Sequence, residues 1–273
     1  MNSLVKRLIT AALLIPVVVW LVLYSTDITF LSVLSLIVFV GAHEWAALSG
    51  IKNRLLKILY SVACLSIAVS SIYLGNDSLQ LIMHIMLGFW FLVVIMLIVI
   101  PQKLMTVKTN VVTLMLLGAF IICSTWLSLY LLRTDFTDGN NLLMYLLLLI
   151  WIADSGAYFA GRAFGQHKLA PVISPGKSIE GVIGGLLACF VFSYFASDYV
   201  GYSSSIIFLA ISITVAFVSV YGDLFESLMK RKAGVKDSGS ILPGHGGVLD
   251  RLDSLLAAAP FFVACLYLFA NKL

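Results

Sequence analysis

Two sets of polar and ionisable residues near the C-terminal end of the sequence could carry chemistry. The first recurs at intervals of three, four and seven residues, which places its members on one helical face: Asp223, Glu226, Ser227 and Lys230. The second repeats that pattern: Asp250, Asp253 and Ser254. Because clustered carboxylates repel one another unless a cation lies among them, the pattern predicts a site for a hard divalent ion such as Mg²⁺. Pairing between helices, with Lys230 or Arg251, is the structural alternative.

The segment between these two sets is rich in glycine and in basic residues. Gly244, Gly246 and Gly247 stand just before the second set. Glycines let a ligand approach the backbone, and N–H groups at the start of a helix bind anions. The neighbouring cations favour a phosphate: Lys230, Arg231, Lys232 and Lys236. We therefore expect a phosphate-bearing substrate at this loop.

The elements that position these residues are membrane spans. The sequence is 61% hydrophobic and 11% charged, with a mean hydropathy of +1.07, whereas soluble domains carry about 25% charged residues. Hydropathy predicts an all-α, polytopic integral membrane protein with about nine transmembrane helices. They lie near residues 8–24, 28–50, 55–74, 79–100, 110–132, 141–160, 178–198, 203–228 and 253–270. Four isolated cysteines inside these spans are expected to be packing residues.

The first apolar run follows Lys6 and Arg7, as the core of a secretory signal peptide would. Pro16 interrupts it, no small-residue cleavage site follows Tyr24, and a second apolar run begins almost at once. We therefore interpret residues 8–24 as a retained first span.

The distribution of basic residues predicts the orientation. With a cytoplasmic N-terminus, the inner segments hold 15 of the 17 Lys and Arg residues, and only Arg133 and Lys272 lie outside. This topology explains the basic balance without a nucleic-acid partner. It divides the chain into an N-terminal scaffold, 1–135, with a possible lipid groove or dimer contacts, and a catalytic region, 136–273. The catalytic region has cytoplasmic loops at 161–180 and 229–250.

The stretch from Ser227 to Asp253 resembles the signature of phosphatidate cytidylyltransferases, also called CDP-diglyceride synthetases. It contains Lys230-Arg231, Lys236-Asp237-Ser238-Gly239, Leu242-Pro243-Gly244-His245-Gly246-Gly247 and Asp250-Arg251-Leu252-Asp253. The stretch from Asp154 to Gly181 looks like that family's penultimate cytoplasmic region, so the resemblance covers roughly the C-terminal 120 residues. It implies that CTP and phosphatidic acid react with Mg²⁺ to give CDP-diacylglycerol and pyrophosphate. The expected protein is an inner (cell) membrane enzyme, often a homodimer, whose active site faces the cytoplasm.

The resemblance and the helical faces together assign roles. The predicted metal ligands are Asp223, Asp250 and Asp253, and a second cation is left open. The predicted catalytic residues are Asp223, Lys230, Lys236, Asp250, Arg251 and Asp253. The predicted substrate-binding residues are Lys168, Ser174, Lys177, Ser227, Arg231, His245, Gly246 and Gly247. The expected mechanism is in-line attack of a phosphatidate oxygen on the α-phosphorus of CTP, without a protein nucleophile.

Two other functions compete with this interpretation. A transporter would place charges near mid-bilayer and show repeat symmetry, whereas these charges gather at one face and no repeat is visible. A CTP-dependent polyprenol kinase would keep the nucleotide and change the acceptor. Outside the two sets, His43 and Glu44 are interpreted as a pair at a helix end, with a role in the site as the less favoured alternative, and His84 is interpreted as structural.

Overall fold

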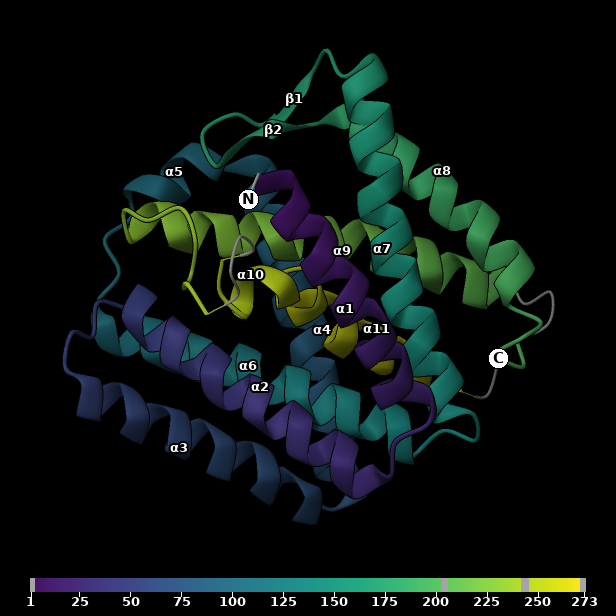
Figure 1. The fold of residues 1–273 in the computed structure, drawn as a ribbon, viewed down its shortest axis with the longest axis horizontal. Helices are drawn as coiled ribbons and strands as arrows, with labels where there is room; N and C mark the ends of the chain where they lie inside the picture. Colours follow the sequence, from purple (N-terminus) through teal and green to yellow (C-terminus); the bar gives the residue numbers. More distant parts are fainter. Residues whose placement is uncertain (1–2, 203–205, 242–245, 271–273) are drawn as a thin grey trace.

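The computed structural model describes residues 3–202, 206–241 and 246–270, and within them it is a helical bundle (Figure 1). The helices are α1 (Ser3–Leu23), α2 (Asp27–Leu48), α3 (Arg54–Ser70) with its 3₁₀ extension η1 (Ser71–Tyr73), α4 (Asn76–Val99), α5 (Pro101–Thr106), α6 (Val111–Thr134), α7 (Gly139–Phe164), α8 (Ile179–Ala196), α9 (Ile206–Lys232), α10 (Leu249–Leu252) and α11 (Leu255–Phe269). Within the described ranges, eight helices are long and apolar enough to cross a membrane. The prediction of an all-α, multi-pass membrane protein is confirmed.

Several helices begin at polar residues that the sequence places just before an apolar run. Asn53 Oδ1 accepts the Leu55 backbone N–H at 2.8 Å, and Asn110 Oδ1 accepts that of Thr113 at 2.7 Å. Ser178 caps α8 in the same way. Such side chains satisfy N–H groups that the first turn leaves without a partner. The starts of these spans are therefore encoded locally.

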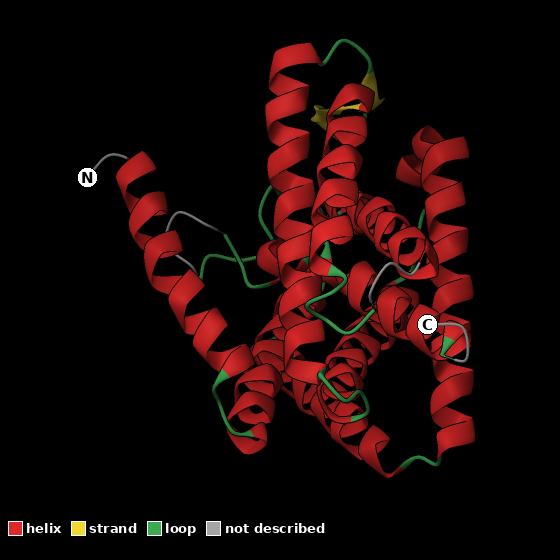
Figure 2. Cartoon of the chain, turned by 90° about the vertical axis from the view of Figure 1, so that its right-hand side faces the viewer, coloured by secondary structure: helices red, strands yellow, loops and turns green. Residues whose placement is uncertain are grey.

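The first predicted span corresponds to α1, and Figure 2 shows its N-terminal part leaning away from the other helices. The apolar part with described side chains is Ala12–Leu23, which is shorter than the eight spanning helices. The predicted total of nine and the cytoplasmic N-terminus stay predictions.

The last predicted span, 253–270, corresponds to α11, which begins two residues later than predicted. The short helix α10 precedes α11, and the break falls at Asp253 and Ser254. The helix α11 is the centre of the bundle, because Ala257, Ala258 and Ala259 are fully buried. These small side chains allow the backbone of α9 to approach closely, as small residues do between membrane helices. This packing holds the ionisable face of α9 beside the α10–α11 break.

Glycines on α8 also allow it to pack closely against α7. A Cβ added to Gly185 would lie 2.7 Å from the Ala153 carbonyl oxygen, and one on Gly181 would lie 2.9 Å from that of Ala157. Only glycine permits this approach of the two backbones. The pairing brings Asp154, on α7, to the same end of the bundle as the start of α8.

A small hairpin, which the all-helical expectation did not include, lies between α7 and α8. Strands β1 (Lys168–Ala170) and β2 (Ser174–Ser178) pair antiparallel, with Lys168 opposite Ser178. Glu180 holds the approach to β1, because its carboxylate accepts the backbone N–H groups of Gln166 and His167 at 3.1 Å each. The hairpin lies outside the spans (Figure 1) and leaves the fold class unchanged.

A polar cluster lies where the C-terminal end of α6 meets the connection between α1 and α2. The guanidinium of Arg133 is buried, and its Nε lies 2.7 Å from Asp27 Oδ1. It also donates to the Val22 and Ser25 carbonyl oxygens at 3.1 and 2.7 Å, and its Cζ lies 4.6 Å from the Phe30 ring centroid. Arg133 thus has a structural role.

Candidate active site

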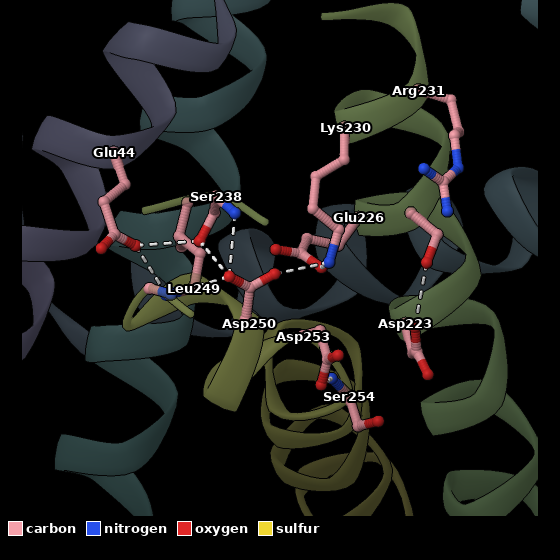
Figure 3. A network of polar contacts seen from close by, with 12 residues as sticks. Glu44, Asp223, Glu226, Lys230, Arg231, Ser238, Leu249, Asp250, Asp253 and Ser254 are labelled. Atoms are coloured by element: carbon pink, nitrogen blue, oxygen red, sulfur yellow. Dashed lines mark hydrogen bonds and ion pairs between the residues drawn. The ribbon is translucent and has the colours of Figure 1, made fainter. Parts of the chain in front are cut away.

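Carboxylates from α7, α9 and the start of the last span converge at one end of the bundle: Asp154, Asp223, Glu226, Asp250 and Asp253. Figure 3 shows the α9 and α10 residues facing one another, as the two helical faces predicted. Asp253 lies within electrostatic range of Asp223, Glu226 and Asp154. The two predicted sets therefore lie together in one cluster.

Asp250 is buried and uses both of its carboxylate oxygens. Its Oδ2 accepts the Ser238 N–H at 2.8 Å, the Ser238 hydroxyl at 2.9 Å and the Gly247 N–H at 2.8 Å. Its Oδ1 accepts a hydrogen bond from Lys230 Nζ at 2.6 Å. Asp250 therefore connects Ser238 and Gly247, on the two sides of the glycine-rich loop, to Lys230 on α9. The prediction that it binds metal directly stays a prediction, and such binding would require it to release at least one of these partners.

Lys230 lies between two buried carboxylates. Its Nζ is 2.6 Å from Asp250 Oδ1 and 2.5 Å from Glu226 Oε2, and its side chain is 11% exposed. Glu226 is fully buried, and within the described part of the chain its Oε1 has no hydrogen-bond partner. A charge taken out of water in this way requires an opposite charge beside it. Lys230 supplies that charge for both carboxylates.

Asp223 joins the hairpin to α9. Its Oδ2 lies 2.7 Å from Lys177 Nζ on β2, and its Oδ1 accepts the Ser227 hydroxyl at 3.2 Å. Lys177 also donates to the Val220 carbonyl oxygen at 3.2 Å. The structure thus places part of the segment between Asp154 and Glu180 against the carboxylate cluster.

Glu44 is the residue of this network that sequence reasoning did not identify. It is 4% exposed near the C-terminal end of α2. Its Oε1 accepts the Val248 N–H at 3.0 Å, and its Oε2 accepts the Leu249 N–H at 2.9 Å and the Ser238 hydroxyl at 3.1 Å. The signal was present as a carboxylate inside an apolar span, but a pair with His43 was the simpler local interpretation. Among the described contacts, Glu44 has no bond to His43.

The N–H groups that were expected to bind phosphate already have carboxylate partners. Gly247 donates to Asp250, and Val248 and Leu249 donate to Glu44. Gly246 has a φ of +82°, and a Cβ there would lie 2.6 Å from Asp250 Oδ2. Here glycine is needed for the turn and for close approach to a carboxylate. The substrate-binding roles of Gly246 and Gly247 stay predictions, and His245 lies outside the described residues.

Other predicted cations remain available. Within the described ranges, no ion pair to a carboxylate is formed by the exposed side chains of Lys168, Arg231, Lys236 and Arg251. Arg231 points away from Asp250 in Figure 3, and its Nε lies 3.5 Å from the Ile173 carbonyl oxygen beside the hairpin. Ser174 is half-buried on β2. These cations could meet an anionic ligand without first breaking an ion pair.

The charge balance of the cluster suits a divalent cation. Five carboxylates interact there with three cationic side chains, Lys177, Lys230 and Arg251. Among the described residues, no three His, Cys, Asp or Glu side chains converge closely enough to hold a metal by themselves. Mg²⁺ commonly takes only one or two carboxylates and completes its shell with water and substrate phosphates. The donor set fits that pattern, with Asp223 and Asp253 on the less hydrogen-bonded side of the cluster.

Comparison with known proteins identifies the family of this chain. The chain is 38% identical to a phosphatidate cytidylyltransferase of Haemophilus influenzae, over 94% of this chain and 96% of that protein. It is 37% identical to a phosphatidate cytidylyltransferase of Pseudomonas aeruginosa, over 96% of each. The model of the cytidylyltransferase family matches residues 5–269. This chain belongs to the cytidylyltransferase family.

Proposed function

We propose that this membrane protein transfers a cytidylyl group from CTP to phosphatidic acid, giving CDP-diacylglycerol and pyrophosphate for phospholipid synthesis. The observation that carries the proposal is the near full-length similarity to two phosphatidate cytidylyltransferases. The site supports it, because a cluster of carboxylates lies beside exposed cations at one end of the helices. A triphosphate and a lipid phosphate both need such cations, and the lipid tail requires a site that is open to the membrane.

In the proposed reaction, a phosphatidate oxygen attacks the α-phosphorus of CTP. One P–O bond forms there, and the bond from the α-phosphorus to the oxygen that bridges to the β-phosphorus breaks. The electron pair leaves with pyrophosphate. Phosphatidate is already anionic, so a strong general base is unnecessary. The protein acts by positioning the two phosphates and by balancing their charge.

The described side chains divide this work. Lys168, Arg231, Lys236 and Arg251 bind phosphate oxygens, because none of them is committed to an ion pair within the described ranges. Lys177 and Lys230 orient Asp223 and Asp250. Asp223 and Asp253 would hold Mg²⁺, which when bound supplies positive charge against the triphosphate.

The site faces the cytoplasm of the cell (inner) membrane in this proposal. The skewed distribution of basic residues supports this orientation, since Lys and Arg are retained on the cytoplasmic side. CTP is also made and kept on that side. The homodimer stays a prediction.

The test uses purified protein in lipid nanodiscs with phosphatidic acid, Mg²⁺ and CTP labelled at either the α- or the γ-phosphate. We expect the α-label to enter the lipid and the γ-label to leave as pyrophosphate. Lipid labelled only by γ-labelled CTP would overturn the proposal in favour of a kinase.

A further inference from the structure

The glycine-rich loop is attached to two different parts of the chain. Asp250, which follows the loop, attaches it to Lys230 on α9. Glu44 attaches it to α2, which lies almost two hundred residues earlier in the sequence. The hydroxyl oxygen of Ser238 lies between both carboxylates, 3.1 Å from Glu44 Oε2 and 2.9 Å from Asp250 Oδ2, so its single proton is shared between them. Ser238 therefore connects Glu44 on α2 to Asp250.

Two glycines of the loop leave room for the Glu44 carboxylate. A Cβ on Gly239 would lie 2.3 Å from Glu44 Oε1, and one on Gly247 would lie 2.5 Å from Glu44 Oε2. Both distances are far below van der Waals contact, so any larger residue would displace the carboxylate or the loop. Gly41, one turn earlier on α2, has the Leu249 side chain 3.3 Å from where its Cβ would be. Glycines on the loop and on α2 thus both allow the close contact between these two segments.

Glu44 also occupies the backbone positions that could otherwise bind an anion. Its two oxygens accept the N–H groups of Val248 and Leu249 at the start of α10, immediately before Asp250. Hydrogen bonds from N–H groups to a carboxylate are about twice as strong as those between neutral groups. The carboxylate therefore fixes the direction in which α10 leaves the loop, and with it the placement of Asp250.

We propose that Glu44 is a positioning residue for the cytidylyl transfer, which holds the loop so that Asp250 and Lys230 stay in their active arrangement. It acts through the loop and touches no reacting atom. The kinetic test of this inference rests on the proposed function. The claim that Glu44 holds the loop does not.

The kinetic test compares Glu44→Gln with Glu44→Asp. Gln replaces one acceptor oxygen by an NH₂ donor that faces N–H or O–H donors, so we expect kcat to fall about 10- to 100-fold, as when a partner of an active-site ligand is removed. KM for CTP should change much less, because no phosphate contact is lost. Glu44→Asp keeps both acceptor oxygens and should recover part of kcat. His43→Gln, at the adjacent position, is the matched control and should behave like the wild type.

A second comparison changes the loop side of the same contact, with Gly239→Ala alone and together with Glu44→Asp. Gly239→Ala should lower kcat, because its methyl group collides with Glu44. The shorter carboxylate of Glu44→Asp withdraws from that methyl group, so the double variant should be more active than Gly239→Ala alone. Simple addition of the two losses would contradict the inference.

A readout independent of activity separates this inference from the proposed function. Amide hydrogen exchange in Glu44→Gln should become faster at residues 246–252 and stay unchanged in the spans distant from the loop. If the wild type transfers no cytidylyl group, the proposed function fails, whereas the exchange result still decides whether Glu44 holds the loop. Unchanged exchange at 246–252, or wild-type kcat in Glu44→Gln, would overturn the positioning role.

Discussion

The two ends of helix α2 take part in charge clusters that differ in burial and in charge balance. At its start, Asp27 pairs with Arg133, whose remaining donors go to two backbone carbonyls. Near its end, Glu44 joins the network of Asp250 and Lys230. Seventeen residues of helix separate the two carboxylates, about 25 Å at 1.5 Å per residue. The same helix therefore supports both clusters.

The clusters differ in their charge balance. The Arg133 cluster combines one cation with one carboxylate that is 71% exposed, and the carbonyls and the Phe30 ring complete its contacts. The other cluster combines Glu44 with five further carboxylates and three cations. The balanced cluster joins helices. The unbalanced one holds excess carboxylates that a bound cation can neutralise, and such groups are common at active sites.

The largest expected effect is on turnover. Asp250→Asn replaces an acceptor of three hydrogen bonds and the partner of Lys230, so we expect kcat to fall about 10²- to 10³-fold while membrane insertion is retained. Arg133→Met should leave kcat of the folded protein unchanged. Lipid labelling normalised to monodisperse protein measures both variants. Full activity in Asp250→Asn would remove the distinction between the clusters.

The second effect is on stability. Lys230→Met leaves two buried carboxylates without their cation, and such a loss costs about 3–5 kcal/mol. Arg133→Met should cost less, about 1–3 kcal/mol, because the Asp27 side chain is already 71% exposed to solvent. Unfolding in mixed detergent and SDS micelles measures the difference. An equal or larger loss in Arg133→Met would show that charge balance does not distinguish the two ends.

The smallest effect concerns substrate affinity. Lys236 is exposed and, among the described residues, has no carboxylate partner, so Lys236→Ala should raise KM for CTP about tenfold with little change in the unfolding midpoint. Lys177→Ala, which removes the partner of Asp223, should lower kcat more than it raises KM. Initial rates over a range of CTP concentrations separate the two cases. A change confined to kcat in Lys236→Ala would argue against phosphate binding by this side chain.

The helices and the ionisable face of α9 could be predicted because they depend on short-range patterns. Apolar runs of spanning length, caps such as Asn53 and Asn110, and the spacing of Asp223, Glu226 and Lys230 are all properties of neighbouring residues. The hairpin and the break at Asp253 were not predicted. Both depend on contacts with other helices, which local periodicity does not contain.

The sequence by itself determined that this is a polytopic helical membrane protein and which segment carries its carboxylates and cations. Only the tertiary structure decided which charges are paired. Lys177 and Lys230 form ion pairs with carboxylates, whereas Lys236 and Arg251 form none within the described residues, and Glu44 on a distant helix binds the glycine-rich loop. The physical reason is that hydrophobicity and helical period act along the chain. A buried carboxylate instead takes the nearest donors in space, and these are set by the packing of α2 against the loop.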